Sequence, residues 1–323
     1  YQNILVTWWP KLFSTVKFSC SYIAHGRSSN ACTSVGTTFS GGVDSFYTLY
    51  QHRSAQEVLP EFRITHCLMI NGFDNDVDHE QNGLFDNLRQ VYEPMLNAEG
   101  LALVVIQTNL RFLRLAVMRQ ENLHLTFGSY LGATALVLGN MFRRFYIPAQ
   151  YNYKSLVQCG VHPMTDHLFS TENTIFIHDG AGVTRVKKTI DIALWPETHS
   201  RLRVCFNGAQ YNEHENIFEN CGKCEKCLRT LIPLECAQLA TQFKVFKQSL
   251  LTKRIKKIKY LSSSARSYAI ENMIFAWQKK RWDIFVVLAY VILRGKMYAT
   301  VLHPVYKKLP SKFQRWIKFR SLS

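Results

Sequence analysis

Four short β-rich runs alternate with helical segments over the first half of this chain, and this alternation most constrains its fold. The runs are SVGTTF at 34–39, FRITHCLMI at 62–70, LALVVIQT at 101–108 and RRFYIPA at 143–149. Strands that alternate with helices at this spacing are typical of βαβ units. The sequence therefore predicts the α/β class, with a doubly wound, mostly parallel sheet.

Length and composition indicate one main domain with an appendage. The chain has 323 residues, of which 47% are hydrophobic and 19% are charged, and this balance excludes a disordered protein. The best apolar run, IFVVLAYVIL at 284–293, has about half of the roughly 20 residues that a spanning helix needs. We expect a cytoplasmic protein with an unassigned segment at 1–36, a main domain at 37–240 and an appended region at 241–323.

The net charge of +16 is concentrated in the appended region. Residues 244–323 hold 19 Lys and Arg against 2 acidic residues, whereas the other 243 residues hold 20 and 21. The pattern there is helical, with Trp and Tyr side chains among the cations. This basic helical extension is predicted to bind tRNA or an anionic membrane surface, the latter as a peripheral attachment. A helical cap that leaves its charges in water is the alternative.

The first β-run leads into the segment SGGVDS at 40–45, which precedes a helical run. Ligands of open parallel sheets bind where such loops enter helices, because helix N-termini present unpaired backbone amides. Gly41 and Gly42 carry no side chain that would keep a phosphate from the backbone. Ser40 and Ser45 supply hydroxyl donors, and Asp44 is placed to hold a Mg²⁺ ion. The segment predicts a polyphosphate site, although it lacks the lysine of a Walker motif.

SGGVDS also resembles the pyrophosphate loop of the PP-loop ATP pyrophosphatases, which are adenine nucleotide alpha hydrolase-like proteins with the HUP fold. A chance Gly-Gly turn is the alternative, but six consecutive matching positions between a strand and a helix argue against it. The resemblance implies that the chain binds ATP and Mg²⁺. The implied ATP-binding residues are Ser40, Gly41, Gly42, Val43, Asp44 and Ser45, with Asn71, Gly72 and Asp74 after the second β-run.

Polar residues are dense in segment 160–188, which we expect to face the nucleotide. Phosphoryl transfer needs cations near the α-phosphate, and we assign this role to Arg185 and Lys188. Together with Asp44 and Ser45 they are the candidate catalytic residues. Loops and caps are the alternative for each single residue. The other polar candidates are His162, Asp166, Ser170, Thr171, Glu172, His178 and Asp179, and His124 and Gly128 lie ahead of them.

Three cysteines in NCGKCEKCLRT at 220–230 form two overlapping C-x-x-C turns. With Cys205 they predict a four-thiolate Zn²⁺ element at 205–227, in which His214 is an alternative ligand. An iron-sulfur cluster or reactive thiols are competing interpretations. The C-x-x-C-x-x-C-Leu-Arg pattern resembles 7-cyano-7-deazaguanine synthase-like proteins, and this resemblance implies a structural zinc site. The ligands are then Cys205, Cys221, Cys224 and Cys227.

The resemblance implies an ATP-dependent ligase of the amidotransferase-like kind. Such an enzyme adenylates a carbonyl or carboxyl oxygen of a small-molecule or modified-base substrate and releases pyrophosphate. A nitrogen nucleophile then displaces AMP. A tRNA-type sulfur transferase is the alternative, and it would need a free catalytic thiol such as Cys159 or Cys67. A protein that binds nucleotide or nucleic acid without turnover is the rival from another class.

Overall fold

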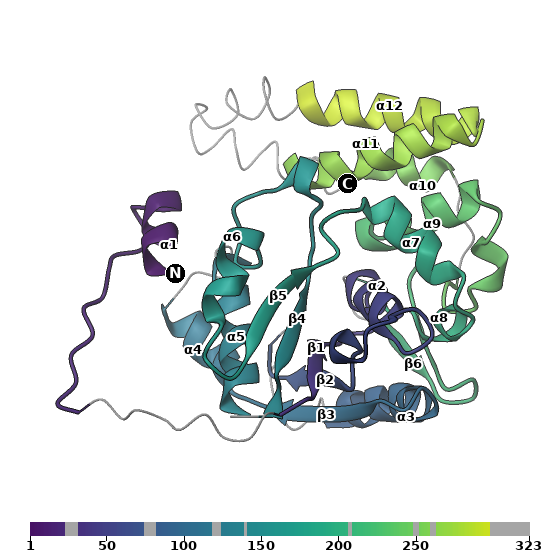
Figure 1. Cartoon of the computed structure of the whole chain (residues 1–323). Coiled ribbons are helices and arrows are strands. Elements are labelled where there is room, and N and C mark those ends of the chain that lie inside the picture. Colours follow the sequence, from purple (N-terminus) through teal and green to yellow (C-terminus); the bar gives the residue numbers. More distant parts are fainter. Residues whose placement is uncertain are drawn as a thin grey trace. The chain divides into compact units, whose positions relative to one another are not determined.

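The computed structural model describes residues 1–22, 32–73, 82–117, 124–138, 141–205, 209–247, 252–258 and 263–297 (Figure 1). The chain forms two compact units. Unit 1 consists of Tyr1–Val204 and Ala209–Glu219. Unit 2 consists of Cys205–Gly208 and Asn220–Ser323. Each unit has its own core and is described separately below.

Unit 1 contains a five-stranded parallel sheet with the strand order β3-β2-β1-β4-β5. Its strands are β1 (Val35–Thr38), β2 (His66–Asn71), β3 (Ala102–Gln107), β4 (Arg144–Pro148) and β5 (Ile175–Asp179). The predicted α/β class and the first four strands are therefore confirmed. From β1 the chain builds the sheet toward β3, and with β4 it turns to the opposite side. The strand order thus reverses between β1 and β4, where ligands of such sheets bind.

Helices cover both faces of this sheet (Figure 1). The helices of unit 1 are α1 (Gln2–Trp8), α2 (Val43–His52), α3 (Asn82–Ala98), α4 (Leu110–Val117), α5 (Phe127–Val137), α6 (Pro163–Asp166), α7 (Arg185–Ala193) and α8 (Glu197–Arg201). Short 3₁₀ turns occupy Pro60–Phe62, Tyr153–Ser155 and His167–Phe169. On the α5 face, Phe145, Ile147 and Phe176 of the sheet pack against Leu131 and Ala135. The three middle residues of β4, Phe145, Tyr146 and Ile147, are all buried, as is typical of a strand covered on both faces.

Three further elements of unit 1 are not part of the strand pattern that the sequence predicts. The strand β5 lies inside the polar segment, where only a short run, Ile175–Asp179, is β-rich. The run TIDIALW at 189–195 belongs largely to α7. An antiparallel hairpin of β6 (Gln210–Asn212) and β7 (Ile217–Glu219) forms within the range 205–227, between Cys205 and Cys221. Short elements with little periodicity are the ones that pattern reading misses.

Unit 2 is helical, which confirms the predicted helical character of the basic region where the structure describes it. It contains α9 (Glu225–Cys236), α10 (Thr252–Lys257), α11 (Ser263–Gln278) and α12 (Trp282–Met297), with a 3₁₀ turn at Ala240–Gln242. Its core is formed by Ile232 and Cys236 of α9, Ile255 of α10, and residues of α11 and α12. Among the described residues, no helix is both long and apolar enough to cross a membrane.

Candidate functional site

The SGGVDS loop joins β1 to α2, and Gly41 is required there for two reasons. Its backbone has a φ of +73°, and a Cβ atom at this position would lie 1.9 Å from the hydroxyl of Tyr92. At Gly42, in contrast, an added Cβ would meet only the Ser40 Oγ at 3.3 Å and the Arg203 carbonyl at 3.8 Å. The absence of a side chain therefore keeps space open at Gly42, whereas at Gly41 it permits the turn and the approach of Tyr92.

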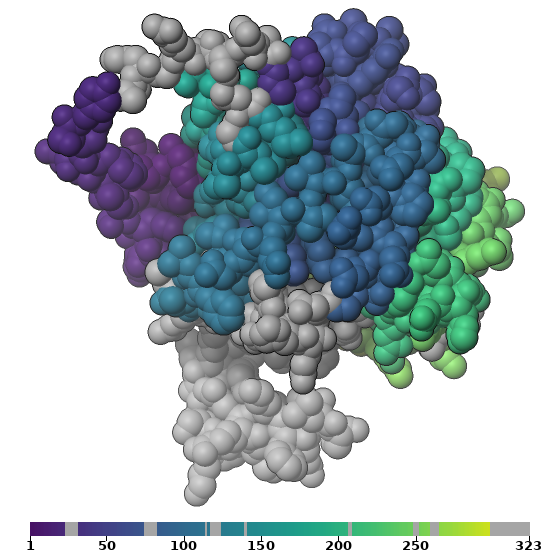
Figure 2. Space-filling model, turned by 90° about the horizontal axis from the view of Figure 1, so that it is seen from below, coloured from purple at the N-terminus to yellow at the C-terminus, as the bar shows by residue number. Residues whose placement is uncertain are grey.

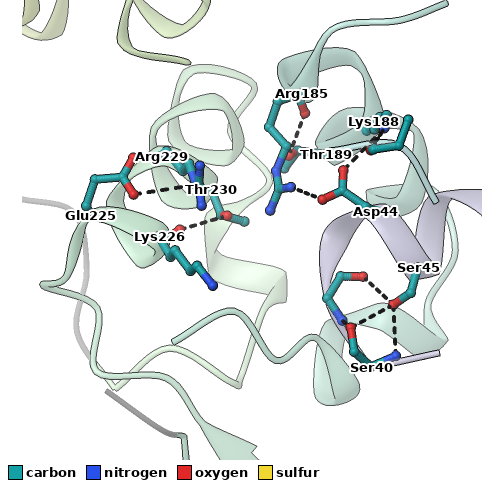
Figure 3. A network of polar contacts seen from close by, with 12 residues as sticks. Ser40, Asp44, Ser45, Arg185, Lys188, Thr189, Glu225, Lys226, Arg229 and Thr230 are labelled. Carbon is teal, nitrogen blue, oxygen red and sulfur yellow. Dashed lines mark hydrogen bonds and ion pairs between the residues drawn. The ribbon is translucent and has the colours of Figure 1, made fainter. Parts of the chain in front are cut away.

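The two serines of the loop differ in their surroundings. Ser45 is buried, and its hydroxyl donates to the carbonyl of Gly42 at 3.0 Å and accepts from the Ser40 amide at 3.3 Å. Ser40 is exposed, and its hydroxyl oxygen lies 3.4 Å from the hydroxyl oxygen of Ser45 (Figure 3). Ser45 thus shapes the loop from inside, and Ser40 is the hydroxyl that a ligand can reach.

Helix α2 begins at Val43 with Gly42 as its extended N-cap residue. Among the described residues, no side chain caps this end of the helix. First-turn amides have no partner within a helix, and the helix dipole adds about half a positive charge at the N-terminus. The start of α2, directly after the central strand β1, therefore has the electrostatic properties of an anion site.

Asp44 lies between the two cations that were proposed from the sequence (Figure 3). Its carboxylate forms an ion pair with Arg185 and accepts from the Lys188 Nζ at 3.2 Å. Lys188 is only 2% exposed, and its Nζ also donates to the Ala149 carbonyl at 2.6 Å. The fold thus brings Asp44 into contact with two candidate residues that lie more than 140 positions away in the sequence.

These contacts lie at the position where the strand order reverses. Ala149 directly follows β4, and the loop with Gly41 and Gly42 follows the neighbouring strand β1. A buried ammonium is costly unless paired, and Lys188 is held by one carboxylate and one carbonyl. The arrangement concentrates a Lys, an Arg and the amides of a helix start around one carboxylate. Chemically, it can bind an anion such as a phosphate.

The other residues predicted to lie near the nucleotide come from the chain around the end of β2 and the start of α5. Asn71 ends β2, one strand away from β1, and Gly72 follows with a φ of +100°. Asp74 lies outside the described residues. Gly128, expected near the nucleotide, instead packs on Gly160, because an added Cβ would lie 1.8 Å from that carbonyl oxygen. His124 is exposed, and its carbonyl accepts from the Gly160 amide.

A second polar cluster forms on the α5 side of the sheet around the buried carboxylate of Asp166. One of its oxygens lies 2.7 Å from the Nδ1 of His178, and the other accepts from the His162 amide at 3.1 Å. His178 is 6% exposed, and its Nε2 is buried without a hydrogen-bond partner among the described residues. A carboxylate that orients an imidazole is an arrangement suited to proton transfer.

Two of the remaining candidates, Ser170 and Thr171, stabilise the local structure of a turn. The Ser170 hydroxyl accepts from the Phe176 amide, and the Thr171 hydroxyl accepts from the amides of Asn173 and Thr174. Glu172 is exposed on the same turn. The contacts of these residues therefore agree with the alternative interpretation, in which they cap a loop.

Asp179 takes part in a network that also contains residues missed in the sequence. His52 lies with Nε2 3.1 Å from Asp179 and Nδ1 3.2 Å from Glu57, and Thr48 donates to Asp179 at 2.6 Å. Burial lowers the pKa of His52, but the two carboxylates outweigh it and the net pKa is raised. Burial raises the pKa of Asp179, but His52, Thr48 and Lys188 bring it below its ordinary value. The spacing of Asp44, Thr48 and His52 along one helix face was the available signal.

In unit 2 the four predicted cysteines form one group, with their sulfur atoms within 4.8 Å of one another. The Sγ–Sγ distance is 3.9 Å from Cys205 to Cys224, 3.8 Å from Cys221 to Cys227 and 3.3 Å from Cys224 to Cys227. Zinc-sulfur bonds of about 2.3 Å in a tetrahedron imply sulfur separations of roughly 3.8 Å. The cysteines can therefore hold a metal such as zinc.

The local chain geometry explains why these thiols converge. Gly222 has a φ of +64° in the turn after Cys221, and the Cys224 amide lies 3.4 Å from the Cys221 sulfur as a donor. Cys224 then becomes the N-cap residue of α9 and Cys227 lies in its first turn. Cys205 is anchored by its amide, which donates to the side chain of Asn220. His214 is exposed in the turn between β6 and β7, and the ligand group consists of cysteines.

An open depression of about 670 Å³ lies on α3. It is lined by side chains of this one helix, whose exposed surface lies in the blue region of Figure 2. Its lining residues are Asp86, Arg89, Gln90, Glu93, Pro94 and Asn97. Arg89 is already paired with Glu93 at 3.3 Å, and the remaining groups are typical of a solvated helix surface. We assign no function to it.

The groups that can bind a ligand ion are therefore the phosphate-compatible loop of unit 1 (residues 40–45 with Arg185 and Lys188) and the four-cysteine cluster of unit 2. Comparison of the chain with protein-family models, with curated proteins and with solved structures returned no match.

Proposed function

We propose that the protein is a PP-loop ATP pyrophosphatase of the HUP class. In this proposal it is an AMP-forming ligase that adenylates a carbonyl or carboxyl oxygen, after which a nitrogen nucleophile displaces AMP. The observation that carries the proposal is the position of the SGGVDS loop. It follows the central strand at the reversal of strand order, and its Asp44 contacts Arg185 and Lys188.

In the proposed reaction the protein binds and positions charge. The amides at the start of α2 and the exposed Ser40 hydroxyl would hold the β- and γ-phosphates. Arg185 and Lys188 would stabilise the negative charge that develops on the α-phosphate when its bond to pyrophosphate breaks. Mg²⁺, when bound, neutralises phosphate charge, and Asp44 is a carboxylate suited to hold it. No covalent bond to the protein is required.

The burial of two thiols favours nitrogen over sulfur as the attacking atom. Cys67 is fully buried in β2, and burial raises the pKa of its thiol. Burial likewise raises the pKa of Cys159 to about 11, and its thiol donates to the Val161 carbonyl. A nucleophilic cysteine needs a lowered pKa and access to solvent, and neither thiol has them. Four cysteines of unit 2 are grouped as ligands, and we assign them to structural zinc because four thiolates leave no open position.

The test uses two neighbouring lysines of α7. Lys188 is buried beside Asp44, whereas the Lys187 side chain is 59% exposed and pairs with Asp191. With Mg-ATP and candidate acceptors, we expect the protein to form equal amounts of AMP and pyrophosphate. Lys188→Gln should lower this rate roughly 100- to 1000-fold, because one charge-stabilising donor is lost. Lys187→Gln should leave the rate close to that of the unchanged protein.

Two results would contradict the proposal. The first is formation of ADP and phosphate, which would place bond cleavage between the β- and γ-phosphates. The second is failure of the folded protein to bind any adenine nucleotide in calorimetry. Circular dichroism of both lysine variants would separate a loss of activity from a loss of folding.

A further inference from the structure

The helices α11 and α12 of unit 2 expose large apolar side chains on their outer sides. In α11 the exposed residues are Ile270, Ile274 and Trp277. In α12 they are Trp282, Val286, Tyr290, Leu293 and Met297. These eight side chains, called the outer apolar face below, are between 40% and 67% exposed.

The spacing shows that this face is a regular property of both helices. The exposed residues recur every three or four positions, as one side of a helix requires. The opposite side of α12, with Ile284, Leu288 and Val291, is fully buried in the core of unit 2. A helix that is apolar all round is typical of one covered on all sides. The centroids of the Trp277 and Trp282 rings are 4.6 Å apart, so the exposed apolar residues of α11 and α12 meet at the turn between the helices.

Cations lie at both ends of the outer apolar face. Lys279, Lys280 and Arg281 lie at the turn between α11 and α12. At the other end of α12, Arg294 donates to the carbonyls of Lys256 and Ile258, which brings the end of α10 beside it. The described parts of 252–297 contain ten Lys and Arg against two acidic residues.

We propose that the outer apolar face binds the surface of an anionic lipid bilayer. Helices that lie in the interface combine Trp, Tyr and aliphatic side chains with flanking Lys and Arg, which attract anionic headgroups. A second copy of the chain is a poorer partner, because both surfaces would carry the same strong positive charge. RNA would use the cations and aromatic rings, but it offers no partner for Ile, Val, Leu and Met.

The experiment measures sedimentation of the full chain with vesicles of phosphatidylcholine containing 30% phosphatidylglycerol, and with pure phosphatidylcholine. We expect binding to the anionic vesicles that weakens as salt rises, and much weaker binding to the neutral ones. The double substitution Val286→Ser with Leu293→Ser should lower the partition coefficient at least about tenfold, because two apolar side chains no longer enter the interface. The matched control is Val58→Ser, since Val58 is 79% exposed in unit 1.

Several outcomes would overturn the inference. Absence of binding to anionic vesicles would do so, as would equal binding by the double variant, which would assign the binding to cations elsewhere, such as those in 298–323. A dimer in light scattering that dissociates in the double variant would identify a second copy as the partner. Tighter, competing retention on RNA would identify nucleic acid. ATP turnover should be unchanged in the double variant, so the test is independent of the proposed reaction.

Discussion

At the scale of single residues, the Asp44 carboxylate has an unusual position because it pairs with two cations, the buried Lys188 and the partly buried Arg185. Lys188 and Arg185 both contact it, and the Lys188 ammonium also donates to the Ala149 carbonyl and lies 5.5 Å from the centroid of the Tyr47 ring. A phosphate that enters the loop therefore competes with Asp44 for both cations. Removal of either cation should leave the remaining one paired, which is why we expect single variants to fold.

The pKa of His52 makes a prediction about stability against pH. Its pKa is raised in the folded protein above the ordinary value of 6.5 by Asp179 and Glu57, which outweigh the burial that lowers it. The stabilisation is fully present below about pH 6.5 and is lost as the pH rises through the higher folded value. We expect the free energy of unfolding, measured in urea titrations, to fall as the pH rises above about 6.5.

The substitution His52→Gln tests whether His52 causes this pH dependence of stability. The variant should be less stable by about 2 kcal/mol at pH 6, because hydrogen bonds to two carboxylates are weakened or lost. Its stability should also change less than that of the unchanged protein between pH 6 and pH 8. His214→Gln is a suitable control, since His214 is exposed. An unaltered pH dependence in His52→Gln would assign the effect to another group.

At the scale of elements, one face of α2 serves two networks. Asp44 contacts the cations of α7, and Thr48 and His52, at successive steps of four residues, contact Asp179 at the end of β5. The helix thus links the phosphate-compatible loop to the strand next to β4. Hydrogen bonds at both ends of this face hold α2 in one rotational position about its axis.

The four-cysteine element predicts dependence of unit 2 on a metal. Thiolate ligands at one tetrahedral ion contribute about 10 to 16 kcal/mol when they form from an unstructured chain. A strong chelator should therefore lower the melting temperature of the helical unit by at least about 10 °C. Metal analysis of the untreated protein should find one zinc per chain.

Cys221→Ser should reduce the zinc content, and Cys20→Ser should not, because Cys20 is an exposed cysteine outside the cluster. Iron with visible absorption would instead support an iron-sulfur cluster. A full zinc content in Cys221→Ser would contradict the assigned ligand set.

At the scale of the whole molecule, the two units carry different candidate sites. The phosphate-compatible loop belongs to unit 1, and the cysteine cluster and the outer apolar face belong to unit 2. Mg-ATP should therefore stabilise unit 1, by about 2.7 kcal/mol at a concentration one hundred times its dissociation constant. A chelator should destabilise unit 2.

Scanning calorimetry distinguishes the two effects. We expect a transition that rises with Mg-ATP and another that falls with chelator. Hydrogen exchange of β1 and α9 would assign the transitions to unit 1 and unit 2. A single transition that responds to both additions would show that the units unfold as one cooperative body, contrary to this prediction.

The sequence alone determined the features that depend on neighbouring residues. The α/β class followed from alternating runs, the loop at 40–45 from its glycines, and the cysteine group from its C-x-x-C turns. Each of these patterns lies within a few residues, so local chain geometry is enough to create it. The function remains a prediction, because no local sequence pattern identifies the acceptor substrate.

Only the tertiary structure decided which distant side chains meet. Tyr92 against Gly41, His52 against Asp179 and Lys188 against Asp44 join residues 51 to 144 positions apart, and no periodicity in the sequence encodes such pairs. The strand β5 was also hidden, because five residues with mixed burial carry little signal. The physical reason is that sheet order and helix packing determine these contacts, and both depend on burial across the whole unit.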